Sequence, residues 1–191
     1  MTVFRKHTPV RRKITTVVNH YSGHRDDLKI DYQNRCGYCN DIDTWRIIWF
    51  EIDHLVPQKY LANIKETDYF NLVYACRSCN NAKRAVWPSG DEKIHNLNDE
   101  GFIDPCDGEY NKQFSRMANG RIKANTKLGE WMYNRMKFYK PQHEIIWNIE
   151  QLDLLIDECE TLLGGMPNDL LKDKVLSLYR EYRKYTKQLG A

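Results

Sequence analysis

Apolar side chains in the last quarter of the chain recur at alternating intervals of four and three residues. The first run is Ile145, Ile149, Leu152, Ile156, Cys159 and Leu163, and the second is Leu171, Val175, Leu178, Tyr182, Tyr185 and Leu189. This spacing gives a helix one apolar stripe, and the Gly-Gly-Met-Pro sequence at 164–167 breaks the helix between the runs. The pattern predicts an antiparallel helical hairpin. Its stripes pack on each other and on the rest of the chain, or they bind another protein.

A second pattern, rich in aromatic and β-branched residues, extends from Trp45 to His54 and predicts one long strand or a strand pair. The stretch Asn71–Ala75 follows, and then a helix is predicted over 79–85, capped by Ser78 and ended before Pro88. The expected order is strand, strand, helix.

Two further segments have local signals. Gln113–Met117 and Arg121–Ala124 flank Asn119-Gly120, a strong hairpin signal in which both turn positions take positive φ. We therefore expect a β-hairpin with a basic outer face. We expect a short helix within residues 21–34. Residues 1–20 are expected to form an extended or disordered basic arm.

Four cysteines form two Cys-x-x-Cys pairs, Cys36/Cys39 and Cys76/Cys79. Two thiolate pairs complete a tetrahedral zinc site, which acts as a structural staple, and Gly37 suits the tight turn of the first pair. The short spacing within each pair argues against a secreted disulfide framework and favours reduced thiols in the cytoplasm. The remaining cysteines, at 106 and 159, are interpreted as small apolar side chains.

The cysteine pairs bracket residues suited to phosphodiester cleavage. His54 is a candidate general base, because a neutral imidazole accepts a proton near physiological pH. Asp53 and Asn80 offer oxygen ligands for a hard divalent cation, Glu51 is a candidate supporting residue, and Asn71 is placed to hold His54 or its loop. Strand alternation directs Asp53 and His54 to opposite faces, so the strand must twist or end there for both to serve one site.

The net charge of +3 conceals a strong segregation. Residues 1–35 carry a net charge of +5 and residues 115–140 carry +6, which leaves the remainder at −8. Two basic segments flanking a candidate catalytic core suit a nucleic-acid backbone, although solvated faces give the same composition. Lys83 and Arg84 share a helical face with Asn80 and are candidates for binding phosphate beside the metal. The other candidate nucleic-acid contacts are Arg11, Arg12, Lys13, Arg116, Arg121 and Lys123.

The constellation resembles the HNH endonucleases, the ββα-metal nucleases with a zinc-ribbon staple. The matching positions are Cys36-x-x-Cys39, Asp53-His54-x-x-Pro57, Asn71 and Cys76-x-x-Cys79-Asn80-x-x-Lys83. The resemblance implies that His54 is the general base, that Asp53 and Asn80 bind the catalytic metal, and that Asn71 is the orienting asparagine. Asn80 stands where the family has its final histidine. The site therefore has one imidazole ligand fewer, which favours Mg²⁺ or Mn²⁺ over the transition metals that prefer nitrogen ligands.

The expected fold class is α+β, with a ββα-metal core, a four-cysteine zinc site, a basic β-hairpin and a C-terminal helical hairpin. The expected divisions are a basic arm (1–20), the nuclease core (21–88), a basic extension (89–140) and the helical hairpin (141–191). No apolar stretch long enough to span a membrane is present.

Phe102–Pro105, Phe114 and Asn119–Ile122 are similar to a bacterial HNH subgroup found beside ATPases in anti-phage systems, including retron-associated and Septu-type nucleases. This resemblance implies a cytoplasmic defence nuclease that cuts DNA, most readily double-stranded DNA, with an ATPase partner on the C-terminal helices. Two alternatives remain: a zinc-dependent nucleic-acid-binding module that does not cut, and an interaction subunit of an ATPase complex.

Overall fold

The computed structural model describes residues 2–44, 49–165 and 168–189 of the chain. Its helices are η1 (Tyr21–His24), α1 (Arg25–Asp31), η2 (Gln58–Tyr60), η3 (Tyr69–Asn71), α2 (Arg77–Lys83), α3 (Gly108–Lys112), α4 (Lys127–Met136), α5 (Pro141–Gly165) and α6 (Asp169–Leu189), where η denotes a 3-10 helix. Its strands are β1 (Thr2–Val3), β2 (Phe50–His54), β3 (Leu72–Cys76), β4 (Asn96–Leu97), β5 (Glu100–Gly101), β6 (Phe114–Arg116) and β7 (Ile122–Ala124).

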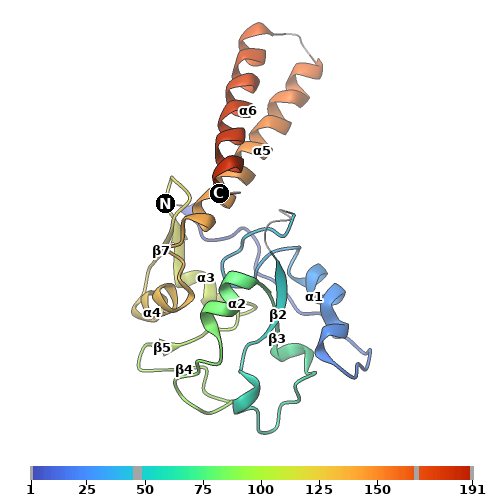
Figure 1. Ribbon diagram of the computed structural model, residues 1–191, viewed down its shortest axis with the longest axis vertical. Coiled ribbons are helices and arrows are strands. Elements are labelled where there is room, and N and C mark those ends of the chain that lie inside the picture. Colours follow the sequence, from blue (N-terminus) through green and yellow to red (C-terminus); the bar gives the residue numbers. More distant parts are fainter. Residues whose placement is uncertain (1, 45–48, 166–167, 190–191) are drawn as a thin grey trace.

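The centre of the molecule is a ββα unit, as the sequence predicts. Strands β2 and β3 pair antiparallel, with Asp53 opposite Val73, and α2 follows β3 directly (Figure 1). Helix α2 begins at Arg77 after a Cys76 N-cap that has no side-chain capping bond, so the predicted Ser78 cap is wrong. Residues 45–48 of the predicted strand lie outside the described residues.

The ββα unit is built into one core with the segments that follow it. Every residue of β3 is buried, because the strand lies between β2 and the rest of the fold. Phe102, Tyr110 and Met132, which come from three later segments, are fully buried in the same cluster. Burial of this kind contributes about 25 cal/mol per Å² of apolar surface, so the later segments and the ββα unit stabilise each other.

The predicted β-hairpin exists, but its turn differs from the prediction. Strands β6 and β7 pair antiparallel, and β1 adds a third strand beside β6. The Gly120 N–H donates to the Met117 carbonyl, and Gly120 has a φ of +88° whereas Asn119 keeps a negative φ. The loop is therefore closed by a single left-handed glycine, and not by a two-residue Asn-Gly turn with two positive φ angles. Added at Gly120, a Cβ would lie 2.6 Å from Trp147, so close packing also requires this glycine.

The C-terminal helices α5 and α6 form the predicted antiparallel hairpin, which projects from the body as an arm (Figure 1). The stripes pack on each other: Leu152, Ile156 and Leu178 form a separate small apolar cluster, flanked by Cys159, Tyr182 and Tyr185. Residues 166 and 167 of the predicted helix break lie outside the described residues. None of the described helices combines the length and apolarity that a membrane-spanning helix needs.

Candidate functional site

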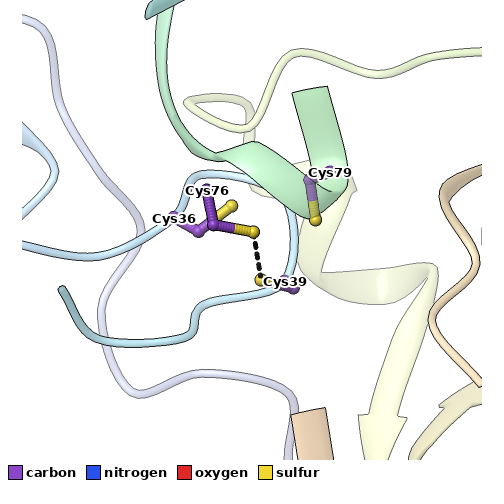
Figure 2. Close-up of side chains that lie close together, drawn as sticks. All are labelled: Cys36, Cys39, Cys76 and Cys79. Atoms are coloured by element: carbon purple, nitrogen blue, oxygen red, sulfur yellow. Dashed lines mark hydrogen bonds between the residues drawn. The ribbon is translucent and has the colours of Figure 1, made fainter. Parts of the chain in front are cut away.

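Four buried cysteine side chains converge from the two Cys-x-x-Cys segments (Figure 2). The sulfurs of Cys36, Cys39, Cys76 and Cys79 all lie within 4.8 Å of one another, and the Cys39 and Cys76 sulfurs are 3.8 Å apart. A tetrahedral zinc site with Zn–S bonds of about 2.3 Å has sulfur–sulfur edges of about 3.8 Å, whereas a disulfide requires about 2.05 Å. The donor set therefore fits a structural zinc ion.

The pKa values of these thiols indicate why the cluster needs a metal. Burial disfavours every thiolate, and it raises the pKa of Cys39 and Cys79. For Cys36 the burial effect is outweighed by hydrogen bonds from the other cysteines, which lower its pKa. A buried cluster with one favoured thiolate stays largely protonated without a cation, so zinc binding releases protons and stabilises the fold.

The first cysteine pair reaches the candidate catalytic strand through Tyr38. Its hydroxyl donates a 2.6 Å hydrogen bond to Asp53 Oδ2. Burial and the adjacent carboxylate raise the Tyr38 pKa, so the phenol stays protonated as a donor. Gly37 has no positive φ; a Cβ there would lie 2.6 Å from Tyr32, and the left-handed residue of the turn is Asn40. The predicted reason for Gly37 is therefore wrong: close packing requires it.

The second contact of Asp53 corrects the prediction for Lys83. The Lys83 ammonium is fully buried, 3.0 Å from Asp53 Oδ2, and it donates a 2.7 Å hydrogen bond to the His54 carbonyl. A side chain in this position cannot contact a DNA phosphate at the surface. Lys83 instead fixes the end of β2 against α2.

Lys83→Met should therefore destabilise the protein rather than weaken nucleic-acid binding alone. The variant leaves Asp53 with one donor fewer in a buried position, at a cost of about 3–5 kcal/mol. Urea denaturation measures the loss. The control is Lys112→Met, which removes an exposed ion pair with Glu109 and should leave the unfolding midpoint nearly unchanged. A Lys83→Met protein as stable as the wild type would contradict the assigned role.

His54 lies at the end of β2 in a defined orientation. Its Nε2 is 2.8 Å from the Glu66 carbonyl oxygen, and its ring lies edge-on to Tyr21 with centroids 4.7 Å apart. A carbonyl only accepts hydrogen bonds, so Nε2 carries the proton and Nδ1 keeps its lone pair. The geometry therefore presents Nδ1 of His54 as a base.

Asn71 holds the loop that follows His54. Its Oδ1 accepts a 2.8 Å hydrogen bond from the Val56 N–H, and its Nδ2 donates a 3.0 Å bond to the Val56 carbonyl. The Leu55 N–H also donates to the Asn71 carbonyl. Asn71 is buried, and its side chain bonds both the N–H and the carbonyl of Val56. It therefore holds the backbone of the loop in place rather than the His54 ring.

Oxygen ligands for a divalent cation gather between β2 and α2. Glu51 and Asp53 share one face of β2, and Asn80 on α2 donates its amide to Glu51 Oε2 at 2.7 Å. Tyr38 and Lys83 both contact Asp53 Oδ2, and within the described part of the chain no hydrogen bond uses Asp53 Oδ1 or Asn80 Oδ1. These oxygens suit Mg²⁺ or Mn²⁺, so the residues present fit such an ion.

The structure does not bring Asp53 and His54 into one set of contacts. The carboxylate contacts Tyr38 and Lys83, whereas the imidazole contacts the Glu66 carbonyl and Tyr21. Strand β2 ends at His54, as the prediction of a shared site required. The two groups therefore flank the end of the strand from different sides, and a substrate phosphate at that end is the group they would share.

The N-terminal segment is extended, as expected, but two of its three predicted DNA contacts form ion pairs within the protein. Arg11 is buried; it donates to the Leu72 carbonyl at 2.8 Å and pairs with Asp104 at 2.7 Å. Arg12 pairs with Asp31 and Asp27, and Lys13 is exposed. The prediction that Arg11 contacts DNA is wrong, because its guanidinium secures the N-terminal segment to β3.

The β6–β7 hairpin also contains both a buried arginine and an exposed one. Arg116 is 1% exposed and donates to the carbonyls of Cys39, Gly120 and His143. It joins the first cysteine segment to the start of α5 and is unavailable to DNA, which corrects its prediction. Arg121 is exposed and pairs with Glu144 at 2.8 Å.

Besides Lys13, two more of the predicted contacts lie on the surface and have no acidic partner in the described ranges. Lys123 on β7 and Arg84 after α2 are exposed. Among the described residues neither forms an ion pair. The predicted basic hairpin face is therefore reduced to Arg121 and Lys123.

Glu92 is a functional candidate that the sequence pattern does not reveal. Its buried carboxylate accepts hydrogen bonds from the backbone N–H groups of Ala62, Asn63 and Ile64. Hydrogen bonds from Asn63 are the largest cause of its lowered pKa, about 2. This loop continues to Glu66, whose carbonyl orients His54, so Glu92 supports the base from a distance.

The lowered pKa of Glu92 predicts a pH-dependent contribution to stability. A depressed carboxyl pKa stabilises the fold above its unfolded value, 4.5, and this contribution is lost as pH falls toward 2. Glu92→Gln should therefore lower the urea midpoint at pH 7, and its difference from wild type should narrow as pH falls from 5 to 3. Glu158→Gln, at an exposed position of α5, is the control. A difference that stays constant with pH would refute the role of the charge.

Comparison with known protein families finds a match, which covers about a quarter of the chain. Residues 36–85 match the family model described as HNH endonuclease. The span begins at the first zinc-cluster cysteine and ends just after α2, so it includes both strands and the helix of the ββα unit. No curated protein and no solved structure matches the chain.

Proposed function

We propose that this chain, which carries an HNH endonuclease domain at residues 36–85, hydrolyses phosphodiester bonds within DNA with His54 as the general base. The observation that carries the proposal is the 2.8 Å contact between His54 Nε2 and the Glu66 carbonyl. It fixes the tautomer that leaves Nδ1 free to accept a proton. A module that only binds nucleic acid has no need of this arrangement.

In the proposed reaction, Nδ1 of His54 takes a proton from a water molecule as the water oxygen attacks phosphorus. The bond from phosphorus to the 3′ oxygen breaks, and the leaving oxygen takes a proton from solvent water. The products carry a 3′ hydroxyl and a 5′ phosphate. Lys83 positions His54 by donating to the His54 carbonyl oxygen, and Asn71 positions it through Val56 in the loop that follows. The imidazolium that forms is hydrogen-bonded at Nε2 to the Glu66 carbonyl, which stabilises the added charge.

Asp53 and Asn80 would hold the catalytic Mg²⁺ or Mn²⁺, with Glu51 beside them. When bound, such an ion supplies stabilisation of negative charge on the phosphoryl group and the leaving oxygen. Tyr38 and Lys83 orient the Asp53 carboxylate through its Oδ2. The separate four-cysteine cluster would hold Zn²⁺ in a structural role.

We also propose that the substrate is double-stranded DNA in the cytoplasm, held through its backbone. The surface cations Lys13, Arg84, Arg121 and Lys123 are the retained candidates for phosphate contacts. Contacts of this kind give little sequence specificity and a steep loss of affinity with salt.

A role in anti-phage defence with an ATPase partner rests on the resemblance of residues 102–122 to that subgroup. The arm formed by α5 and α6 is the proposed docking element. Exposed leucines on the arm support this assignment. Leu162 is 57% and Leu170 is 82% exposed, and both lie outside the apolar cluster that α5 and α6 form between them.

One experiment tests the nuclease proposal. The purified protein is incubated with supercoiled plasmid, linear DNA and RNA, with Mg²⁺, with Mn²⁺, or with no added divalent ion. Metal-dependent nicking of DNA, with 5′ phosphates on the products, is the expected result. Tight DNA binding with no cutting under any of these conditions would favour the binding module instead.

A further inference from the structure

A basic pocket adjoins the HNH domain on the side of α2. It has a volume of about 370 Å³ and lies between the start of β2, the outer face of α2 and the segment joining α4 to α5. Its lining includes Trp49, Arg77, Arg84, Lys137 and Lys140, and no acidic residue in the described part of the chain lines it. A pocket with this lining attracts anions.

The cations of this pocket are poorly neutralised. Arg77 is exposed, and its Nε is 3.7 Å from Glu51 Oε1, a loose contact. Lys140 donates to the Ser78 hydroxyl at 3.1 Å. In the described ranges Arg84, Lys137 and Lys140 form no ion pair, in contrast with Arg11 and Arg12 of the N-terminal segment. Unpaired cations in one pocket favour a polyanion with closely spaced charges.

Trp49 adds a flat apolar surface to the pocket. Its side chain is 72% exposed, which is unusual for a residue of this size. Its carbonyl accepts a 2.7 Å hydrogen bond from the Arg77 N–H, which ties it to the start of α2. An exposed indole beside arginine and lysine side chains is the combination that binds single-stranded nucleic acid, because bases stack on the ring while cations contact the backbone.

The pocket lies next to the proposed metal site. Arg77 and Asn81 line it from α2, the helix that also carries Asn80. Arg77 contacts Glu51, and Glu51 accepts the hydrogen bond from Asn80. A strand whose phosphate lies at the metal site therefore has its neighbouring nucleotides beside Trp49.

We propose that this pocket binds an unpaired stretch of the nucleic acid next to the scissile phosphate, with one base stacked on Trp49 and phosphates on Arg84, Lys137 and Lys140. The proposal deepens the nuclease function and rests on it for the position of the cut. Inside an intact duplex the base faces are covered by their neighbours, so the preferred substrate is a duplex that has unpaired nucleotides beside the cleavage site.

Binding measurements test the pocket without relying on cleavage. Fluorescence anisotropy with no added divalent ion compares a single-stranded 12-mer with the duplex of the same sequence, for wild type and Trp49→Ala. Stacking of one base on an aromatic side chain raises the affinity for a single strand by about tenfold or more. We expect Trp49→Ala to lose about tenfold on the single strand and less than about twofold on the duplex.

Matched variants separate the base contact from the backbone contact. Tyr179→Ala removes another exposed aromatic side chain, on α6, and should leave both affinities unchanged. Lys137→Ala should lower the salt dependence of single-strand binding by about one unit of slope, whereas Lys174→Ala on the arm should not. Circular dichroism confirms that each variant folds.

Unchanged single-strand affinity in Trp49→Ala, or equal losses on single strand and duplex, would overturn the proposal. DNA and RNA single strands both offer bases for stacking and phosphates for the cations, so both are tested. Trp49-dependent binding to either one supports the proposal. Its absence for both would overturn the proposal. Failure of the nuclease proposal is seen separately, as wild-type protein that shows Trp49-dependent binding but never cuts.

Discussion

We expect His54→Ala to abolish the proposed DNA cleavage, while the protein stays folded and its zinc content is unchanged. Loss of a general base lowers the rate by about 10²–10⁴-fold, which takes plasmid nicking below detection in an ordinary assay. The loop after His54 should keep its structure in this variant, because the Asn71 side chain holds the Val56 backbone without using the imidazole. The measurement is nicking of supercoiled plasmid over time, with the zinc content determined on the same sample.

The control for this variant is His7→Ala, which removes an exposed histidine of the N-terminal segment and should cut at the wild-type rate. His54→Gln is a second variant that keeps a hydrogen-bond donor but no titratable base, and it should be equally inactive. Cutting by His54→Ala at a rate near that of the wild type would exclude the imidazole as the base.

Cys76→Ser has the largest expected effect on stability. Zinc binding to a cysteine site is associated with about 10–16 kcal/mol, which is comparable to the whole stability of a typical domain. Cys76 is also the last residue of β3 and the N-cap of α2, so loss of the metal releases the junction of both elements. We expect loss of zinc and of the cooperative thermal transition of the HNH domain.

The matched variant is Cys159→Ser. Cys159 is half-buried beside the apolar cluster of α5 and α6 and lies outside the zinc cluster. It should retain one zinc per chain and a melting temperature within a few degrees of the wild type. An unchanged melting curve in Cys76→Ser, with zinc still bound, would show that the cysteine cluster is not the staple.

We expect zinc loss to lower the proposed nuclease activity as well, because Tyr38 connects the cysteine cluster to Asp53 on β2. Tyr38 lies between two zinc ligands and donates to Asp53, while Arg116 donates to the Cys39 carbonyl from β6. Disorder in the first cysteine segment therefore removes one of the two donors that orient Asp53. A zinc ion in the cysteine cluster would therefore influence the orientation of Asp53, although the cluster does not include that residue.

Local sequence spacing was sufficient to predict the elements that carry the site. The ββα order, each Cys-x-x-Cys pair and the two helical stripes depend on residues close together in sequence, where periodicity and motif spacing give a direct signal. The meeting of the two cysteine pairs, which are 37 residues apart, was predicted from the four ligands that a zinc ion needs. The resemblance to HNH endonucleases, carried by the same motif, agrees with the family match at residues 36–85.

The partners of charged residues could not be predicted in this way. Arg11 pairs with Asp104, and Arg116 reaches Cys39 and His143, over separations of 27 to 93 residues. A basic segment looks the same in sequence whether its side chains contact solvent, DNA or buried carbonyl groups. Lys83 shows this most clearly, since its motif position suggested a phosphate contact and its ammonium is fully buried.

Proximity of the base and the catalytic cation is the central claim, and Mn²⁺ tests it directly. We would record the ring resonances of the six histidines in ¹⁵N-labelled protein, assign His54 with the His54→Ala variant, and add Mn²⁺ in the presence of a DNA oligonucleotide. The prediction is selective broadening of the His54 ring while His7 stays sharp, and no broadening in Asn80→Ala. A His54 ring that stays sharp while Mn²⁺ supports cleavage would contradict the account.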